Sequence, residues 1–234
     1  MQKRHLKKGL LLVIEGIDGA GKTTQAERLH KILAEDGWDV IRSKEPTDGQ
    51  WGRKLRESAT TGRLSPEEEL ELFMRDRKEH VQTLLNPALE QGKIVIVDRY
   101  YFSTAAYQGA RGLDPEEILR KNEEFAPQPS LLVFLDVEPE VGVRRIRQRG
   151  DRENLFEERD SLAAVANVFR RIKRSYLHRV DGTLPPDDIT HGLIEKLYAG
   201  PLSSDHPQGF DAPTTGDLWM KLFELTDTKG HKRE

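Results

Sequence analysis

Residues 10–29 read LLLVIEGIDGAGKTTQAERL, an apolar run that turns into glycines, a lysine and two threonines before a helix-like pattern begins. Residues 16–23 match the pattern G-x-x-x-x-G-K-[ST] at every fixed position, after a predicted strand and before a predicted helix. In that context backbone N–H groups and the positive end of the helix face phosphate oxygens. The stretch therefore predicts an α/β fold that binds a nucleoside triphosphate.

Individual roles in this loop follow from the chemistry of a triphosphate. The Lys22 ammonium is expected to reach the β- and γ-phosphates, and the Thr23 hydroxyl is expected to ligate Mg²⁺. The residues expected to bind the phosphates of the nucleoside triphosphate are Gly16, Gly19, Ala20, Gly21, Lys22, Thr23 and Thr24. The loop by itself leaves open whether the chain is a kinase, a GTPase-like switch or a mechanical ATPase.

Composition narrows the class of protein. The chain has 234 residues, which suits one domain with an appendage. Its 37 basic and 40 acidic residues leave no excess of positive charge that would favour binding to nucleic acid or to an acidic membrane. It contains no cysteine, which excludes disulfides, cysteine nucleophiles and thiolate metal sites and fits a cytoplasmic location. The apolar run at residues 10–14 is too short for a signal peptide or a membrane span, so we interpret it as a buried strand.

Short runs of branched aliphatic residues alternate with longer helical patterns. The runs lie at residues 10–14, 40–43, 94–97 and 131–135 and lack polar alternation, which is typical of parallel strands covered on both faces. The helical patterns span residues 23–36, 66–91 and 115–124. This alternation predicts a three-layer α/β sandwich.

The end of the chain is less regular. Charges become dense after Val141, and a long helix is predicted from about residue 161 to residue 179. After Gly200 the composition is that of a linker, followed by a short amphipathic pattern with apolar residues at 218, 219, 222, 223 and 225. We therefore predict one domain over residues 1–200 and a tail over 201–234. That tail has two open interpretations: docking on this protein or its dimer mate, or binding a separate partner.

Two further groups of residues point to the chemistry. Asp98 and Arg99 follow a buried strand, at the edge where open α/β sheets bind ligands; the Asp is a candidate Mg²⁺ ligand and the Arg a candidate phosphate clamp. Phe73 and Arg77 are four residues apart and share one helix face, which places an aromatic plane beside a forked donor. That pair suits a nucleobase.

Together these residues resemble the thymidylate kinase family over about residues 8–199. Three blocks carry the resemblance: the phosphate loop with Asp18, the helix LF…R…H, and DRY…S…AYQ. The resemblance implies a P-loop nucleotide kinase fold with a five-stranded parallel sheet and a mobile lid at about residues 144–159. It also implies transfer of the γ-phosphoryl group of ATP to dTMP, giving dTDP and ADP, with Mg²⁺ as cofactor and a homodimer as the assembly.

The resemblance assigns residues to the acceptor's base and sugar. Phe73 resembles the ring that stacks on thymine, and Arg77 resembles the donor to its exocyclic oxygen. Thr104 and Gln108 resemble positions that contact the base. Tyr107 resembles the bulky ring that excludes a ribose 2′-hydroxyl.

A second set of positions lies near the acceptor phosphate. Asp18 resembles the family's acidic loop residue near the acceptor sugar and phosphate, and Arg99 resembles the phosphate clamp. The loop KEPTDGQWG departs from the usual Arg-Glu-Pro-Gly-Gly-Thr, so Lys44 stands where the family has a phosphate-gripping arginine. Lysine keeps the charge and loses the fork, so Arg56 is expected to share this role.

Members of the family whose phosphate loop lacks a basic residue carry the catalytic arginine on the lid. Gly19 occupies that loop position here, so Arg147, Arg149 and Arg152 are the lid candidates. A further departure follows Tyr176, where about ten residues, including much of the final strand, are expected to be missing. Two alternatives remain: a related deoxynucleotide or nucleoside kinase with another acceptor, and a non-catalytic regulatory protein that binds nucleotides.

Overall fold

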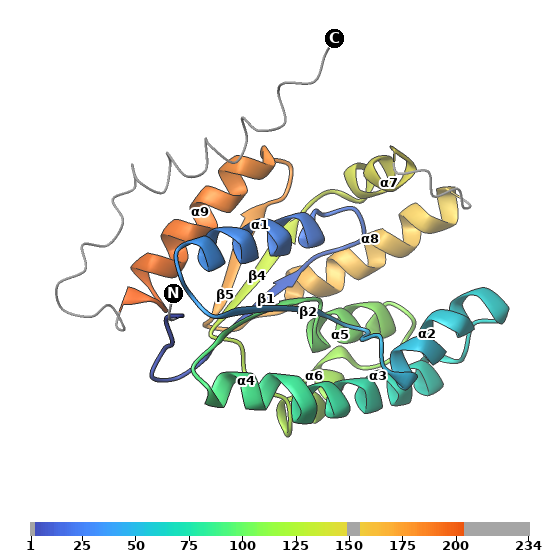
Figure 1. The fold of residues 1–234 in the computed structure, drawn as a ribbon. Helices are drawn as coiled ribbons and strands as arrows, with labels where there is room; N and C mark the ends of the chain where they lie inside the picture. Colours follow the sequence, from blue (N-terminus) through green and yellow to red (C-terminus); the bar gives the residue numbers. More distant parts are fainter. Residues whose placement is uncertain (1–2, 149–154, 204–234) are drawn as a thin grey trace, which may run out of the picture.

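The fold is an α/β sandwich built on one five-stranded sheet (Figure 1). The computed structural model describes residues 3–148 and 155–203. Its strands are β1 (Leu10–Glu15), β2 (Val40–Lys44), β3 (Ile94–Asp98), β4 (Leu131–Asp136) and β5 (Leu177–Asp181). They lie in the order β2-β3-β1-β4-β5, and every neighbouring pair is parallel. The predicted three-layer fold with a five-stranded parallel sheet is confirmed.

The sheet is the core of the molecule. Every residue of β1 is buried, including Glu15, and the first four residues of β3 are buried as well. A strand covered by helices on both faces cannot alternate polar and apolar residues, which explains the unbroken aliphatic runs. Because parallel strands all point the same way, their carboxyl ends gather the loops after β1, β2, β3 and β4 along one edge.

Helices cover both faces of the sheet. Figure 1 shows α1 and α9 on one face, and α4, α5 and α6 on the other. The helices of the described residues are α1 (Lys22–Glu35), α2 (Gln50–Thr61), α3 (Pro66–His80), α4 (Asn86–Glu90), α5 (Tyr101–Gly109), α6 (Pro115–Glu123), α7 (Pro139–Gln148), α8 (Leu155–Arg171) and α9 (Pro186–Ala199). In the described part of the chain, no helix has the length and apolar character needed to cross a membrane.

The predicted helix at residues 66–91 contains a change of helix type. It starts with a capping box, in which the Ser65 hydroxyl accepts from Glu68 N at 3.2 Å and the Glu68 carboxylate accepts from Ser65 N at 3.0 Å. It then passes through a π-helical turn, η1 (Val81–Leu85), before α4. Pro87 lies in the first turn of α4. Because proline lacks an N–H and crowds the preceding turn, it interrupts regular α-helical hydrogen bonding just before it.

Two expectations for the end of the domain are wrong. The helix predicted at 161–179 is α8, which ends at Arg171, and the next strand begins at Leu177. The final strand is not lost: β5 pairs with β4 over five residues, from Leu132 beside Leu177 to Asp136 beside Asp181. Residues 177–181 become a strand because β4 offers their backbone hydrogen-bond partners, and the local sequence, which is partly charged, gives no sign of that pairing. The tail predicted at 201–234 lies mostly outside the described residues.

Candidate active site

The phosphate loop joins β1 to α1 and depends on glycine. Gly19 has a φ of 79°, and a Cβ there would lie 2.4 Å from the carbonyl oxygen of Gly142. Gly16 has a φ of 151°, and a Cβ there would lie 2.7 Å from the carbonyl oxygen of Leu135. Gly21 is the N-cap of α1 and provides no side-chain cap, so N–H groups of the first turn remain available. The loop thus has the geometry of an anion site at a helix N-terminus.

Lys22 is held beneath this loop. Its Nζ donates to the carbonyl oxygen of Ile17 at 2.8 Å, and the side chain is buried. Burial, together with the nearby positive charge of Arg99, lowers the pKa of Lys22 from 10.5 to about 8. An anionic phosphate beside the ammonium would favour the charged form, because an opposite charge raises the pKa of an amine.

Thr23 and Asp98 meet at the ends of two neighbouring elements. The Thr23 hydroxyl donates to Asp98 Oδ2 at 2.5 Å, and Asp98 is the last residue of β3. The other oxygen, Oδ1, is buried and has no hydrogen-bond partner among the described residues. An unpartnered carboxylate oxygen beside a hydroxyl fits a hard divalent cation, which prefers oxygen ligands. No group of three or more metal-binding side chains is found in the described residues, and Mg²⁺ bound together with a nucleotide does not need one.

Arg99 lies between the phosphate loop and α5. Its backbone is left-handed, with a φ of 69°, and its guanidinium donates to Ser103 Oγ at 3.1 Å and to Asp18. Tyr107 donates to the other oxygen of Asp18 at 2.7 Å. Burial alone would raise the pKa of Asp18, but the charges of Arg99 and Lys22 outweigh it, so the net pKa lies below its usual value. Asp18 thereby ties the phosphate loop to Arg99 at the end of β3 and to Tyr107 of α5.

Glu15 is a polar residue of this region that the sequence interpretation missed. Its carboxylate accepts from Tyr100 N at 2.7 Å and from Ser103 N at 3.0 Å, at the start of α5. Burial raises the pKa of Glu15 to about 7, against the lowering effect of these hydrogen bonds and of Arg99. The signal in the sequence is a single charged residue directly after the apolar run at residues 10–14.

A cavity of about 550 Å³ opens beside Arg99. A volume of this size suits a mononucleotide. Eight of the nine residues predicted to bind the acceptor line it: Asp18, Arg56, Phe73, Arg77, Arg99, Thr104, Tyr107 and Gln108. These residues come from the phosphate loop, α2, α3, the end of β3 and α5, so the fold brings together segments that are far apart in the sequence.

The wall formed by α3 and α5 has defined contacts. The buried Arg77 donates from Nη2 to Thr104 Oγ1 at 3.0 Å and from Nη1 to Asn122 Oδ1 at 2.6 Å. Gln108 Nε2 donates to Glu69 Oε2 at 2.9 Å, which fixes the orientation of the amide. Phe73 is partly exposed, so its ring is accessible from the cavity. The wall therefore offers an aromatic face next to a guanidinium.

Lys44 is the ninth predicted acceptor residue, and it does not line this cavity. It lines a neighbouring cavity of about 620 Å³ together with Thr23 and Asp98, and its Nζ lies 3.3 Å from Asp48 Oδ1. Register explains this placement, because Lys44 on β2 pairs with Asp98 on β3. Arg56 does line the acceptor cavity, where it donates to the carbonyl oxygens of Pro46 at 3.2 Å and Thr47 at 2.9 Å.

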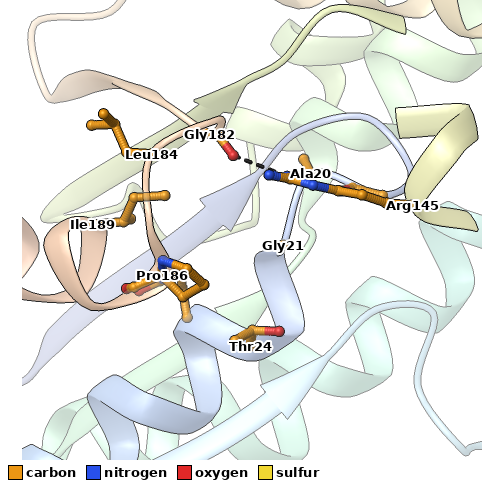
Figure 2. A pocket seen from close by; sticks show the side chains of 10 residues that line it. Ala20, Gly21, Thr24, Arg145, Gly182, Leu184, Pro186 and Ile189 are labelled. Atoms are coloured by element: carbon orange, nitrogen blue, oxygen red, sulfur yellow. Dashed lines mark hydrogen bonds between the residues drawn. The ribbon is translucent and has the colours of Figure 1, made fainter. Parts of the chain in front are cut away.

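A smaller cavity of about 150 Å³ borders the phosphate loop and the start of α1 (Figure 2). Its walls come from the loop, the start of α1, α7 and the turn between β5 and α9. Arg145 of α7 donates to the carbonyl oxygens of Gly182 at 2.9 Å and Gly19 at 3.3 Å. Sequence reasoning missed this arginine, which lies in the segment named as the lid. Of the three lid candidates, Arg147 ends up in α7, and Arg149 and Arg152 lie outside the described residues.

Comparison with known proteins is consistent with this arrangement. A family model described as "Thymidylate kinase" matches residues 14–192. The thymidylate kinase of Xanthomonas euvesicatoria pv. vesicatoria (strain 85-10) is 51% identical over 200 residues, covering 84% of this chain and 88% of that protein. The thymidylate kinase of Akkermansia muciniphila (strain ATCC BAA-835) is 50% identical over 191 residues, covering 82% of this chain and 92% of that protein.

Proposed function

The chain belongs to the thymidylate kinase family and phosphorylates dTMP with ATP, giving dTDP and ADP, and we propose that it does so with the residues at the carboxyl edge of its sheet. One observation carries the proposal. Asp18 belongs to the phosphate loop and forms an ion pair with Arg99, which lines the acceptor cavity. Donor and acceptor phosphates bound on either side of this pair would lie next to each other.

Catalysis by this site consists of alignment and charge neutralisation. Phosphoryl transfer needs little covalent chemistry from the protein, and the attacking atom is an ionised phosphate oxygen at neutral pH. Lys22 and the loop N–H groups would hold the donor phosphates, and Arg99 would hold the acceptor phosphate. The cations of Lys22 and Arg99 would both lie near the transferring phosphoryl group, so that they would neutralise its negative charge during transfer.

Acceptor recognition is assigned to the cavity of about 550 Å³. Phe73 would stack on thymine, Arg77 would donate to its exocyclic oxygen, and Thr104 would contact the base edge. The Tyr107 ring would crowd a ribose 2′-hydroxyl and favour deoxyribose. Gln108 would support the base side, and its amide is already oriented by Glu69.

Other basic residues would add positive charge around the phosphates. Arg56 would help to bind the acceptor phosphate from the cavity wall, and Lys44 would act from the side of Asp98. The lid arginines Arg147, Arg149 and Arg152 are proposed to approach the transferring phosphoryl group. The smaller cavity beside Arg145 is proposed to receive the base side of ATP, because phosphate-loop residues form one of its walls.

The divalent metal of this ATP-dependent family is proposed to be Mg²⁺. Thr23 and Asp98 would hold it, and the unpartnered Oδ1 of Asp98 supports that assignment. When bound, Mg²⁺ supplies positive charge to the β- and γ-phosphates. Thr23 lies in the first turn of α1 and Asp98 ends β3, so both proposed ligands stand on regular elements.

Steady-state ADP formation from MgATP tests the function. The acceptors are dTMP, dUMP, dCMP, dGMP, dAMP and thymidine, with Lys22→Ala as control. Turnover led by dTMP and lost in the control is expected. Turnover led by another acceptor would overturn the roles of Phe73, Arg77 and Thr104, and ATP binding without turnover would favour a regulatory protein.

We also propose a cytoplasmic homodimer, in which residues 1–200 form the kinase domain, with a lid at about 144–159, and residues 201–234 form an appendage. The family resemblance supports the dimer, and the absence of cysteine fits a reducing compartment. Light scattering of the purified chain tests the assembly: a mass near twice 26.8 kDa is expected, and a mass of one chain would contradict it.

A further inference from the structure

A cluster of four side chains borders the acceptor cavity: the buried Glu45, Arg77 and His80 and the partly buried Ser43; we call it the Glu45 cluster. Arg77 donates from Nε to Glu45 Oε2 at 2.8 Å, and its Nη2 lies 2.7 Å from the same oxygen. His80 Nδ1 lies 2.9 Å from Glu45 Oε1. His80 Nε2 lies 2.8 Å from Ser43 Oγ. The cluster therefore joins the end of β2 to α3 through the Glu45 carboxylate and the Ser43 hydroxyl.

The two oxygens of Glu45 have different partners. Oε2 accepts from Arg77, and Oε1 faces His80. Because a carboxylate accepts hydrogen bonds, His80 Nδ1 is the donor toward Glu45 Oε1, and His80 Nε2 is left to contact the Ser43 hydroxyl. The rotation of the carboxylate is then set by both partners, so a change at His80 is transmitted to Arg77.

Burial strengthens the link from His80 to Arg77 through the Glu45 carboxylate. The side chains of Arg77 and Glu45 are 1% and 3% exposed, and that of His80 is 3% exposed. A charge removed from water needs a well-placed partner, and a network with one unsatisfied member loses more than one isolated hydrogen bond. Ser43 extends the same network to β2, whose position is fixed by its pairing with β3.

The cluster bears on acceptor recognition because Arg77 and Glu45 both line the acceptor cavity. The guanidinium also contacts Thr104 and Asn122, and it lies 5.5 Å from the centre of the Tyr100 ring. Its plane is therefore held from several sides, and His80, which is not among the residues that line the cavity, contacts it only through Glu45. A small rotation of the guanidinium plane would turn its N–H donors away from the base.

We propose that His80 is a positioning residue for base recognition: through Glu45 it fixes the orientation of the Arg77 guanidinium, and thereby sets affinity for the thymine base and discrimination against cytosine. The inference rests on the proposed contact between Arg77 and the base. His80 touches neither substrate nor the reacting atoms, so the chemical step does not depend on it.

Two isosteric substitutions of His80 separate its two contacts. In His80→Asn the side-chain amide stands where Nδ1 stands and keeps a donor toward Glu45. In His80→Gln the amide stands where Nε2 stands, so it keeps Ser43 and loses Glu45. We expect His80→Gln to raise the KM for dTMP about tenfold and to lower the preference for dTMP over dCMP by a similar factor.

The other kinetic constants provide the controls. The KM for dTMP of His80→Asn and of Ser43→Ala is expected to stay within about threefold of the wild-type value. For His80→Gln, the kcat at saturating dTMP and the KM for MgATP are expected to change by less than about threefold. Equal effects of His80→Asn and His80→Gln on the KM for dTMP, or a loss confined to kcat, would overturn the proposal.

A double variant separates this inference from the proposed function. If Arg77→Ala leaves the KM for dTMP and the dCMP preference unchanged, the base contact itself is wrong. If Arg77→Ala changes both, His80→Gln is expected to add less than about twofold to the KM for dTMP in that background, because there is no guanidinium left to orient. A full tenfold effect of His80→Gln in the Arg77→Ala background would overturn the positioning role and leave the base contact standing.

Discussion

Ser103 binds both oxygens of the Glu15 carboxylate, with its backbone N–H donating to Oε1 at 3.0 Å and its hydroxyl donating to Oε2 at 2.5 Å. Ser103 also accepts from Arg99 at 3.1 Å. The carboxylate at the end of β1 thus holds the first turn of α5, and α5 in turn holds the arginine proposed to bind the acceptor phosphate. Glu15 supports the site without lining the acceptor cavity.

Glu15→Gln is expected to make stability less dependent on pH. Burial raises the pKa of Glu15 from 4.5 to about 7 in the folded chain, so the folded state keeps a proton that the unfolded state releases. The stability contributed by this group is fully present below pH 4.5 and is lost as pH rises through 7, by about 3 kcal/mol. Glutamine does not titrate, so the free energy of unfolding of the variant minus that of the wild type should rise by that amount between pH 4.5 and 8.

Urea unfolding at a series of pH values measures this difference. All other groups titrate in both proteins, so their contributions largely cancel. A difference that stays constant between pH 4.5 and 8 would show that Glu15 binds its proton equally in the folded and unfolded states.

Asp98→Asn is expected to weaken the binding of Mg²⁺ during turnover. The amide keeps one oxygen but replaces the other with a donor that repels a cation, so the Mg²⁺ concentration needed for half-maximal turnover should rise about 10- to 100-fold. Thr23→Ser is the matched control, because it keeps the hydroxyl beside Asp98. Removal of Mg²⁺ with EDTA should abolish turnover of the wild type, and an unchanged Mg²⁺ dependence in Asp98→Asn would contradict the assignment.

Tyr107 is expected to have two separable effects. Tyr107→Phe removes the hydroxyl that donates to Asp18 at 2.7 Å and keeps the ring. It should lower kcat by about three- to tenfold through Asp18 and Arg99, while the preference for dTMP over ribothymidine monophosphate stays unchanged. Tyr107→Ala removes the ring as well, so that preference should fall. Equal sugar preferences in the two variants would refute a role for the ring in excluding the 2′-hydroxyl.

Gly19→Ala is expected to destabilise the protein and impair ATP binding. The new Cβ would approach the carbonyl oxygen of Gly142 to 2.4 Å at a φ of 79°, a combination that costs more than about 2 kcal/mol. Gly192→Ala in α9 is the matched control, since a Cβ there meets nothing within 4 Å. It should stabilise the helix by about 0.5 to 1 kcal/mol. Thermal unfolding and ATP titration of both variants check the contrast.

Much of the fold could be predicted because its signals are local. The strands at the centre of the sheet are unbroken aliphatic runs, and the helix from Pro66 begins with a capping box that the sequence contains in full. The strand β5 escaped prediction because its residues are partly polar and become a strand only by pairing with β4. The π-helical turn before Pro87 depends on hydrogen-bond geometry that side-chain periodicity does not encode.

For the site, motif spacing predicts candidate residues where the chemistry lies within one segment. The glycines of the phosphate loop and the pair Phe73 and Arg77 are examples, and the cavity brings the acceptor residues together. Lys44 lies beside Asp98 and outside this cavity because it pairs with Asp98 in the register of β2 against β3, and register is not visible in a single segment.

The sequence by itself determined the class of fold, the phosphate loop and the family, because these depend on residue types at fixed short spacings. The tertiary structure alone decided how Glu15 holds α5 and how Glu45 divides its oxygens between Arg77 and His80. Those contacts join residues 32 to 88 positions apart. A buried carboxylate acquires its role from the donors that the folded chain brings to it, and those donors come from other elements.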